Sequence, residues 1–209
     1  MIALAALLLA GSAEHDAAAE VIAAERAFAE AAQTDGQWTA FRRFARGDAV
    51  MFAPNVGFAS EILDGLSDPP ISVRWWPART FISCDGTMAV NTGPWVRPGN
   101  RVGYFVTVWA RQADGSWRWT LDDGADLDMP VAAGEQPTVR RAACDGEFRR
   151  FRTGAPAGAY IPTHGSSVDQ TLRWRWERER GGGSVLTVTM FNGDEFETVI
   201  EHRTPAPAR

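Results

Sequence analysis

Hydrophobic and polar residues alternate in two neighbouring segments in the middle of the chain, residues 103–109 and 117–123. An Asp-Gly step separates them, and between alternating segments this step is the strongest short-range signal for a β-hairpin. Simple alternation puts Trp119 and Leu121 on one face of the second strand and Asp122 on the other. The pattern therefore predicts a long hairpin with carboxylates at the end of an apolar ribbon.

The N-terminal part of the chain has a helical pattern. Apolar residues recur at helical spacing in residues 17–33, Asp16 is a candidate N-cap, and Asp35-Gly36 would end the helix. A second helix, a short strand and a short third helix are predicted at 37–46, 48–54 and 58–66. From residue 71 the pattern is one of strands. Helices followed by long strands are typical of an α+β fold with N-terminal helices packed on a curved antiparallel sheet.

The composition changes after Asp128. Residues 129–170 read as a linker and an irregular segment with one further strand near 138–144, and 204–209 as a disordered tail. Residues 171–203 alternate again and turn at glycine-containing steps, which predicts a C-terminal three-stranded β-meander. Because such a meander is too small to be stable alone, we expect it to dock on the main domain, residues 14–128.

The chain begins with an apolar run at residues 2–10, far shorter than the ~20 residues of a membrane-spanning helix. We interpret residues 1–13 as a signal peptide and expect a periplasmic or secreted protein that is not embedded in a membrane. No basic residue precedes the apolar run, so either the true start lies upstream or the signal is weak.

The composition is that of a globular protein, with 45% hydrophobic and 22% charged residues among 209. All 21 basic residues are arginine, which we interpret as the bias of a GC-rich coding sequence. The net charge of −5 argues against a nucleic-acid partner, because such partners need a basic face.

The only two cysteines, Cys84 and Cys144, have two interpretations. In an oxidising compartment they could form a disulfide that closes a ~60-residue loop and adds roughly 3–4 kcal/mol. Alternatively they are separate thiols, one of them buried. Two cysteines without flanking histidines do not make a zinc site, and we expect neither a metal nor a cofactor.

The order of elements and the strand sequences resemble the nuclear transport factor 2-like superfamily, which has the cystatin-like fold. The resemblance covers residues 17–128 and is greatest to small exported proteins of uncharacterised function and to SnoaL-like polyketide cyclases. The matching pieces are Glu25-Arg26-Ala27-Phe28-Ala29, Trp75-Trp76-Pro77, Asp85-Gly86, Thr92-Gly93-Pro94-Trp95, Gly103-Tyr104, Val108-Trp109, Asp114-Gly115-Ser116-Trp117 and Asp122. The resemblance implies a cone of curved sheet closed by the helices, and a homodimer formed through the convex face of the sheet.

Enzymes of this superfamily place an Asp, His or Tyr inside the cone. The histidines of this chain, His15, His164 and His202, all lie outside the cone segment. The resemblance therefore leaves Asp122 as a candidate general base, with Tyr104 as a hydroxyl donor. The alternative is that Asp122 accepts backbone hydrogen bonds or pairs with an arginine at the rim of the cone.

Tryptophans are the candidate ligand-binding residues, since small-molecule pockets are mostly apolar and aromatic. The candidates in the cone segment are Trp75, Trp76, Trp95 and Trp109. Adjacent strand residues face opposite ways, so only one of Trp75 and Trp76 can face the cone. The alternative is that these side chains fill the space between sheet and helices. Trp174 and Trp176 should hold the meander against the main domain, or form an aromatic binding platform if exposed.

These observations favour an exported domain that binds a small apolar molecule, or a binding module without chemistry. The alternatives are an isomerase, dehydratase or cyclase that uses Asp122, and a protein-interaction module that dimerises.

Overall fold

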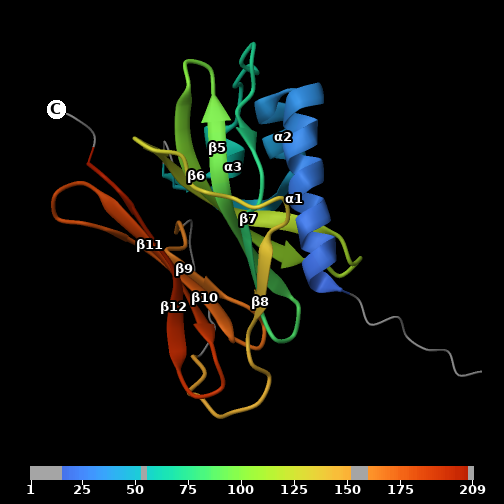
Figure 1. Cartoon of the computed structure of the whole chain (residues 1–209), viewed down its shortest axis with the longest axis vertical. Helices are drawn as coiled ribbons and strands as arrows, with labels where there is room; N and C mark the ends of the chain where they lie inside the picture. The colour runs from blue at the N-terminus through green and yellow to red at the C-terminus, as the bar shows by residue number, and fades with distance from the viewer. Residues whose placement is uncertain (1–15, 53–55, 152–159, 207–209) are drawn as a thin grey trace, which may run out of the picture.

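In the computed structural model of the chain, the structure describes residues 16–52, 56–151 and 160–206. These residues form three layers (Figure 1). N-terminal helices cover one face of an eight-stranded sheet, and a four-stranded sheet covers the other face. We call the face toward the helices the inner face and the face toward the second sheet the outer face. This arrangement confirms the predicted α+β fold with a C-terminal β-extension.

The first helix, α1 (Ala17–Thr34), begins at the predicted N-cap. The carboxylate of Asp16 accepts hydrogen bonds from the backbone N–H groups of Ala18 and Ala19, which a helix start leaves unpaired. Helix α2 (Gln37–Phe44) follows at once, after Gly36 with a φ of 109°. Such a φ favours glycine, and the two helices therefore meet at a sharp corner.

The first sheet has the strand order β2-β1-β7-β6-β5-β4-β8, and β3 pairs with β5. Among the described strands of this sheet, only the pairs β1–β7 and β4–β8 are parallel. The sheet is not closed, because β2 and β8 remain edges. Its strands are β1 (Ala45–Met51), β2 (Gly57–Phe58), β3 (Arg74–Trp75), β4 (Arg79–Ile82), β5 (Met88–Arg97), β6 (Arg101–Arg111), β7 (Trp117–Leu127) and β8 (Thr138–Arg141).

The long hairpin is β6 and β7, but its faces differ from the prediction. Val108 of β6 pairs with Leu121 of β7, and the next residue, Trp109, pairs with Trp119, so the pairing skips Thr120. This β-bulge turns Trp119 toward the helices and Leu121 toward the second sheet. Asp122 consequently lies on the same face as Trp119. Simple alternation, which put Trp119 with Leu121 and Asp122 opposite them, was wrong here because a bulge shifts the period by one residue.

Other boundaries also differ from the prediction. The helix predicted at 58–66 is reduced to α3 (Ala59–Ile62), and β1 begins immediately after α2. Strand β8 pairs with β4, so the first sheet continues beyond Asp128. The segment that joins β7 to β8 crosses over β5 and β6 (Figure 1, yellow).

The second sheet has four strands in the order β12-β11-β10-β9, one more than predicted. They are β9 (His164–Ser166), β10 (Leu172–Arg178), β11 (Ser184–Phe191) and β12 (Phe196–Thr204). The extra strand, β9, has three residues and is too short for alternation to reveal it. The sheet buries Trp174 and Trp176 against the outer face, where Trp176 stacks on Phe52 with 4.6 Å between ring centroids.

Cys84 and Cys144 form a disulfide, which is compatible with export. It links the segment after β4 to the segment after β8. Nearby, Asp85 and Asp169 each accept a hydrogen bond from the other's backbone N–H, at 2.8 and 2.9 Å, so that loops of the two sheets are joined directly.

The predicted signal peptide, 1–13, lies outside the described residues. Within residues 16–52, 56–151 and 160–206, no helix is long and apolar enough to cross a membrane.

Candidate functional site

The space between the helices and the inner face is filled by aromatic side chains. Trp75, Trp95 and Trp109 are 7%, 8% and 0% exposed and belong to this core. Phe28 of α1 contacts Trp75 and Trp109 edge-on, with ring centroids 4.8 and 6.1 Å apart. Three of the four candidate ligand-binding tryptophans therefore lie in packed protein, and Trp76 is 40% exposed on the other side of its strand.

A buried carboxylate, Glu25, lies at the centre of this core. It accepts hydrogen bonds from the indole N–H groups of Trp75 and Trp109 at 2.8 and 2.7 Å, and from the amide of Asn91 at 3.1 Å. Burial raises its pKa, and these three donors act in the opposite direction. Glu25 is thus a structural link between α1 and the sheet, which the helical pattern of the sequence does not reveal.

The candidate acid–base pair is split between the two faces of the sheet. Asp122 faces inward, where its Oδ2 accepts a hydrogen bond from Thr107 at 3.0 Å. Burial raises its pKa well above the ordinary value; Thr107 lowers it, and the negative charges of Glu25 and Asp123 raise it further. Tyr104 faces outward, toward the second sheet. The two side chains therefore do not meet.

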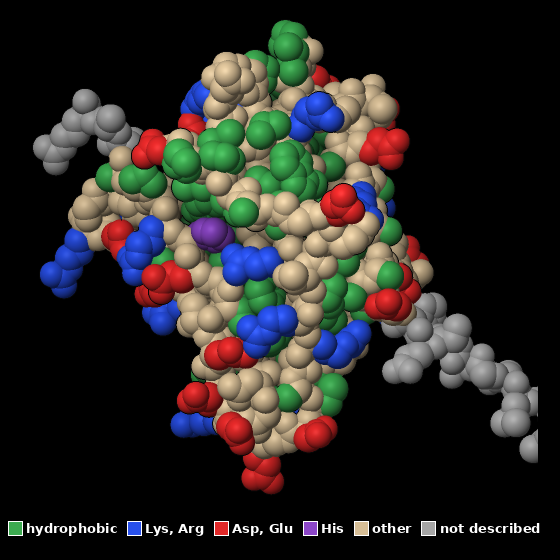
Figure 2. Space-filling view, viewed as in Figure 1, with side chains coloured by type: hydrophobic (Ala, Val, Ile, Leu, Met, Phe, Trp, Pro, Cys, Tyr) green, Lys and Arg blue, Asp and Glu red, His purple; other side chains and the backbone are tan. Residues whose placement is uncertain are grey.

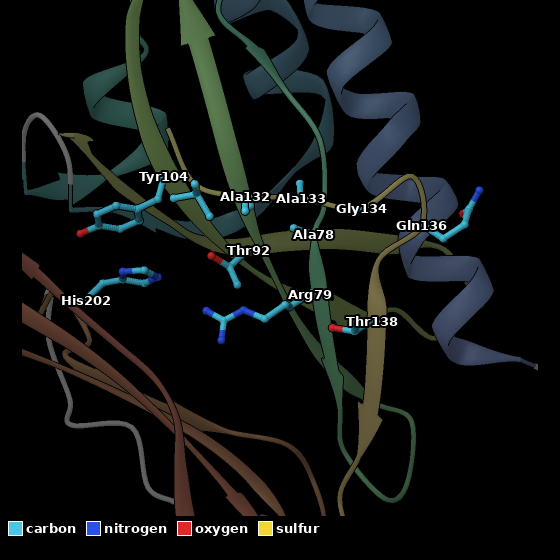
Figure 3. A pocket seen from close by; sticks show the side chains of 12 residues that line it. Ala78, Arg79, Thr92, Tyr104, Ala132, Ala133, Gly134, Gln136, Thr138 and His202 are labelled. Carbon is cyan, nitrogen blue, oxygen red and sulfur yellow. The ribbon is translucent and has the colours of Figure 1, made fainter. Parts of the chain in front are cut away.

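A cleft of about 270 Å³ opens on the outer face, where the second sheet leaves the first uncovered. Its floor comes from β4, β5 and β6, one wall from the segment before β8, and the other wall from His202 on β12 (Figure 3). On the face shown in Figure 2, hydrophobic side chains gather above a histidine, and basic side chains lie below it. The lining residues that matter for chemistry are Arg79, Thr92, Tyr104 and His202.

Tyr104 and His202 bridge the two sheets at this cleft. Their rings are stacked, with centroids 3.8 Å apart and planes inclined by 13°. The Tyr104 hydroxyl and the His202 Nε2 are buried, and neither has a hydrogen-bond partner in the described parts of the chain. Thr204 lies near the hydroxyl, but the geometry between them is not that of a hydrogen bond. Such orphaned polar atoms are rare in native proteins and call for an explanation.

The protonation states around the cleft follow from burial. Burial raises the pKa of Tyr104 to about 12, so its hydroxyl is a donor at neutral pH. Burial, helped by the positive charge of Arg79, lowers the pKa of His202 to about 4, so its ring is neutral. Asp123, behind Tyr104 and 3% exposed, has its pKa raised by burial to about 6. Arg79 is the positive charge that lines the cleft.

The floor of the cleft needs a glycine. A Cβ at Gly93 would lie 2.2 Å from the carbonyl oxygen of Trp76 and 2.9 Å from the nitrogen of Ala78. The chain between β3 and β4 can therefore run close beside β5, where Trp76 and Ala78 donate backbone hydrogen bonds to Pro94 and Thr92 and Arg79 pairs with Thr92 in the ladder.

Sequence reasoning missed His202 and Arg79. The signal for His202 was available, because it lies two residues after Ile200, which is buried in the core between the sheets. Nothing in the sequence around Arg79 distinguishes it from the other arginines. Among the described residues, no group of three or more His, Cys, Asp or Glu side chains is placed to hold a metal ion.

No protein-family model matches the sequence, and no curated protein matches it. Among solved structures, the chain is similar to a nuclear transport factor 2 (NTF2-like) superfamily protein from Salmonella enterica subsp. enterica serovar Typhimurium str. LT2. The two chains are 15% identical, with a TM-score of 0.42, over 57% of this chain and 94% of that one. This solved structure belongs to the superfamily that the sequence resembles.

Proposed function

We propose that the protein binds a small molecule in the cleft between β12 and the outer face of the first sheet. The observation that carries the proposal is the pair of buried polar atoms without partners, the Tyr104 hydroxyl and the His202 Nε2, in residues that line this cleft. A buried polar group left unpaired costs about 1–3 kcal/mol. Both atoms are shielded from solvent, so a ligand would recover that free energy by displacing the stacked rings and supplying the missing partners.

The size and lining of the cleft support a ligand smaller than a drug molecule. Its volume of about 270 Å³ lies just below the usual range for drug-sized ligands, roughly 300–1,000 Å³. Apolar side chains of the segment before β8 face a few polar groups, which is the usual composition of a small-molecule site.

This location differs from the cone interior that the resemblance implies. The cone is occupied by the cluster around Glu25, and the outer face, named as a dimerisation surface, is largely covered by the second sheet. The cleft lies on that face, beside the second sheet. Asp122 does not line the cleft. Its role as a general base is separate from this proposal and stays a prediction.

The test is an NMR screen of the ¹⁵N-labelled protein with a library of small neutral and charged fragments. We expect hits that shift the amides of Thr92, Gly93 and His202. The variant Ala133→Trp, which fills the cleft from an exposed position in its wall, should abolish these shifts. Ala113→Trp, in the exposed turn between β6 and β7, is the matched control and should leave them. No hits, or shifts that persist in Ala133→Trp, would refute the proposal.

A further inference from the structure

We infer that the ligand of this cleft is a small organic carboxylate with an apolar body, and that Arg79 binds its carboxylate. This inference rests on the proposed function and specifies the class of ligand.

The first step concerns the ion pairs that Arg79 lacks within the described residues. Several arginines of the two sheets have carboxylate partners: Arg97 and Arg101 pair with Asp126, Arg140 with Glu197, and Arg203 with Glu179. Within the described residues Arg79 forms no ion pair, and its guanidinium lies 5.8 Å from the ring of Phe81. A guanidinium presents planar donors that match a carboxylate in a bidentate fashion. Arg79 therefore offers an unused anion-binding group.

The second step concerns the charges of the other groups around the cleft. The neutral His202 adds no charge. The Tyr104 hydroxyl is shielded from solvent and directed away from Arg79 (Figure 3), so it can donate to a ligand only if the stacked rings shift. Asp123 does not line the cleft. Arg79 is thus the charged group that lines the cleft, and it favours a negatively charged ligand.

The third step is the apolar wall. Arg79 extends from β4 toward His202, and Ala132, Ala133 and Gly134 lie along the opposite edge (Figure 3). Ala78 and Val131 add further apolar surface to the lining. An inorganic anion would leave this wall without contacts, whereas a carboxylate with a compact hydrocarbon or aromatic body would contact both the wall and Arg79.

Benzoate and benzamide test the inference, because they share one shape and differ in charge. In NMR titrations at neutral pH we expect benzoate to shift the amides of Thr92 and His202 and to bind at least about fivefold more tightly than benzamide. Arg79→Gln should weaken benzoate binding by at least about fivefold and leave benzamide binding unchanged. Arg79→Lys, which keeps the charge, should retain part of the preference.

Arg74→Gln is the matched control, because Arg74 is exposed on β3 and does not line the cleft. It should bind benzoate as the unmodified protein does, and the dispersed spectrum of each variant reports that it is folded. If benzamide binds in the cleft as tightly as benzoate, or if benzoate binding survives Arg79→Gln, the carboxylate inference fails while the proposed function stands. If benzoate and every other fragment leave the cleft unshifted, both fail.

Discussion

The ring of Tyr104 on β6 lies parallel to the imidazole of His202 on β12, with 3.8 Å between centroids. These residues are far apart in the sequence and belong to different sheets. Tyr104 belongs to the floor of the cleft and His202 to one of its walls. The candidate site is therefore formed when the second sheet docks on the first. The fold and the proposed binding function are therefore linked through this pair.

Replacing His202 by phenylalanine should change how stability depends on pH. The pKa of His202 is about 4 in the folded protein and near 6.5 when unfolded, so the unfolded chain binds more protons between these values. His202 therefore destabilises the protein as pH falls from about 6.5 to 4. His202→Phe keeps an aromatic ring against Tyr104 and removes this pH-dependent loss of stability.

Urea unfolding at several pH values measures the effect. We expect the variant to gain on the order of 1 kcal/mol relative to the unmodified protein as the pH falls through this window, a value reduced for the partial exposure of the imidazole. A difference between the two proteins that does not change with pH would contradict the assignment.

Replacing Glu25 by glutamine should destabilise the protein although the two side chains have the same shape. Both oxygens of Glu25 accept from N–H donors, and the amide of glutamine would face one of those donors with a donor of its own. We expect a loss of about 1–3 kcal/mol in the free energy of unfolding, measured with urea. Glu30→Gln, on an exposed position of the same helix, is the control and should change stability by less than about 0.5 kcal/mol.

Asp123→Asn should stabilise the protein at alkaline pH. The folded-state pKa of Asp123, about 6, exceeds the ordinary value of 3.8, so its favourable contribution at low pH is lost as pH rises through 6. Above that pH the unmodified protein holds a buried charge whose Oδ1 has no hydrogen-bond partner among the residues that the structure describes. The variant should gain up to about 3 kcal/mol at mildly alkaline pH and nothing at pH near 3. Equal stability of the two proteins at both pH values would show that Asp123 is not desolvated.

Removing the disulfide with Cys84→Ser and Cys144→Ser together should lower the free energy of unfolding by about 2–4 kcal/mol, because the bond closes a long loop in the unfolded chain. Thermal and urea unfolding under oxidising conditions measure the loss. The unmodified protein in a reducing agent should show a similar decrease, and the variant should show no further decrease on reduction.

Local patterns in the sequence were enough to predict the longest elements. Helical spacing with Asp16 as the cap predicted α1, and alternation around an Asp-Gly step predicted the hairpin of β6 and β7. The bulge at Thr120 was not predictable, because it is an insertion relative to the neighbouring strand and leaves no signal within its own strand. For that reason alternation placed Trp119 and Asp122 on opposite faces, whereas both face the helices.

The candidate site depends on contacts between distant segments. Glu25 meets a tryptophan 84 residues away, and His202 reaches Tyr104 only because the second sheet packs on the first. Alternation can indicate that His202 faces a core, but it cannot say which residue of another sheet lies opposite. Alternation could not show that Trp75, Trp95, Trp109 and Phe28 pack together and fill the space beneath the helices, with Trp76 left outside it.

The most direct test of the cleft as a binding site is Tyr104→Phe, measured for both stability and benzoate affinity. The hydroxyl has no hydrogen-bond partner among the described residues, so its removal should leave the free energy of unfolding unchanged or raise it by about 1 kcal/mol. The same change should weaken benzoate binding by about fivefold, because the ligand loses a hydrogen-bond donor. A variant that loses stability and binds benzoate as before would contradict the account, since the hydroxyl would then serve the fold and not the ligand.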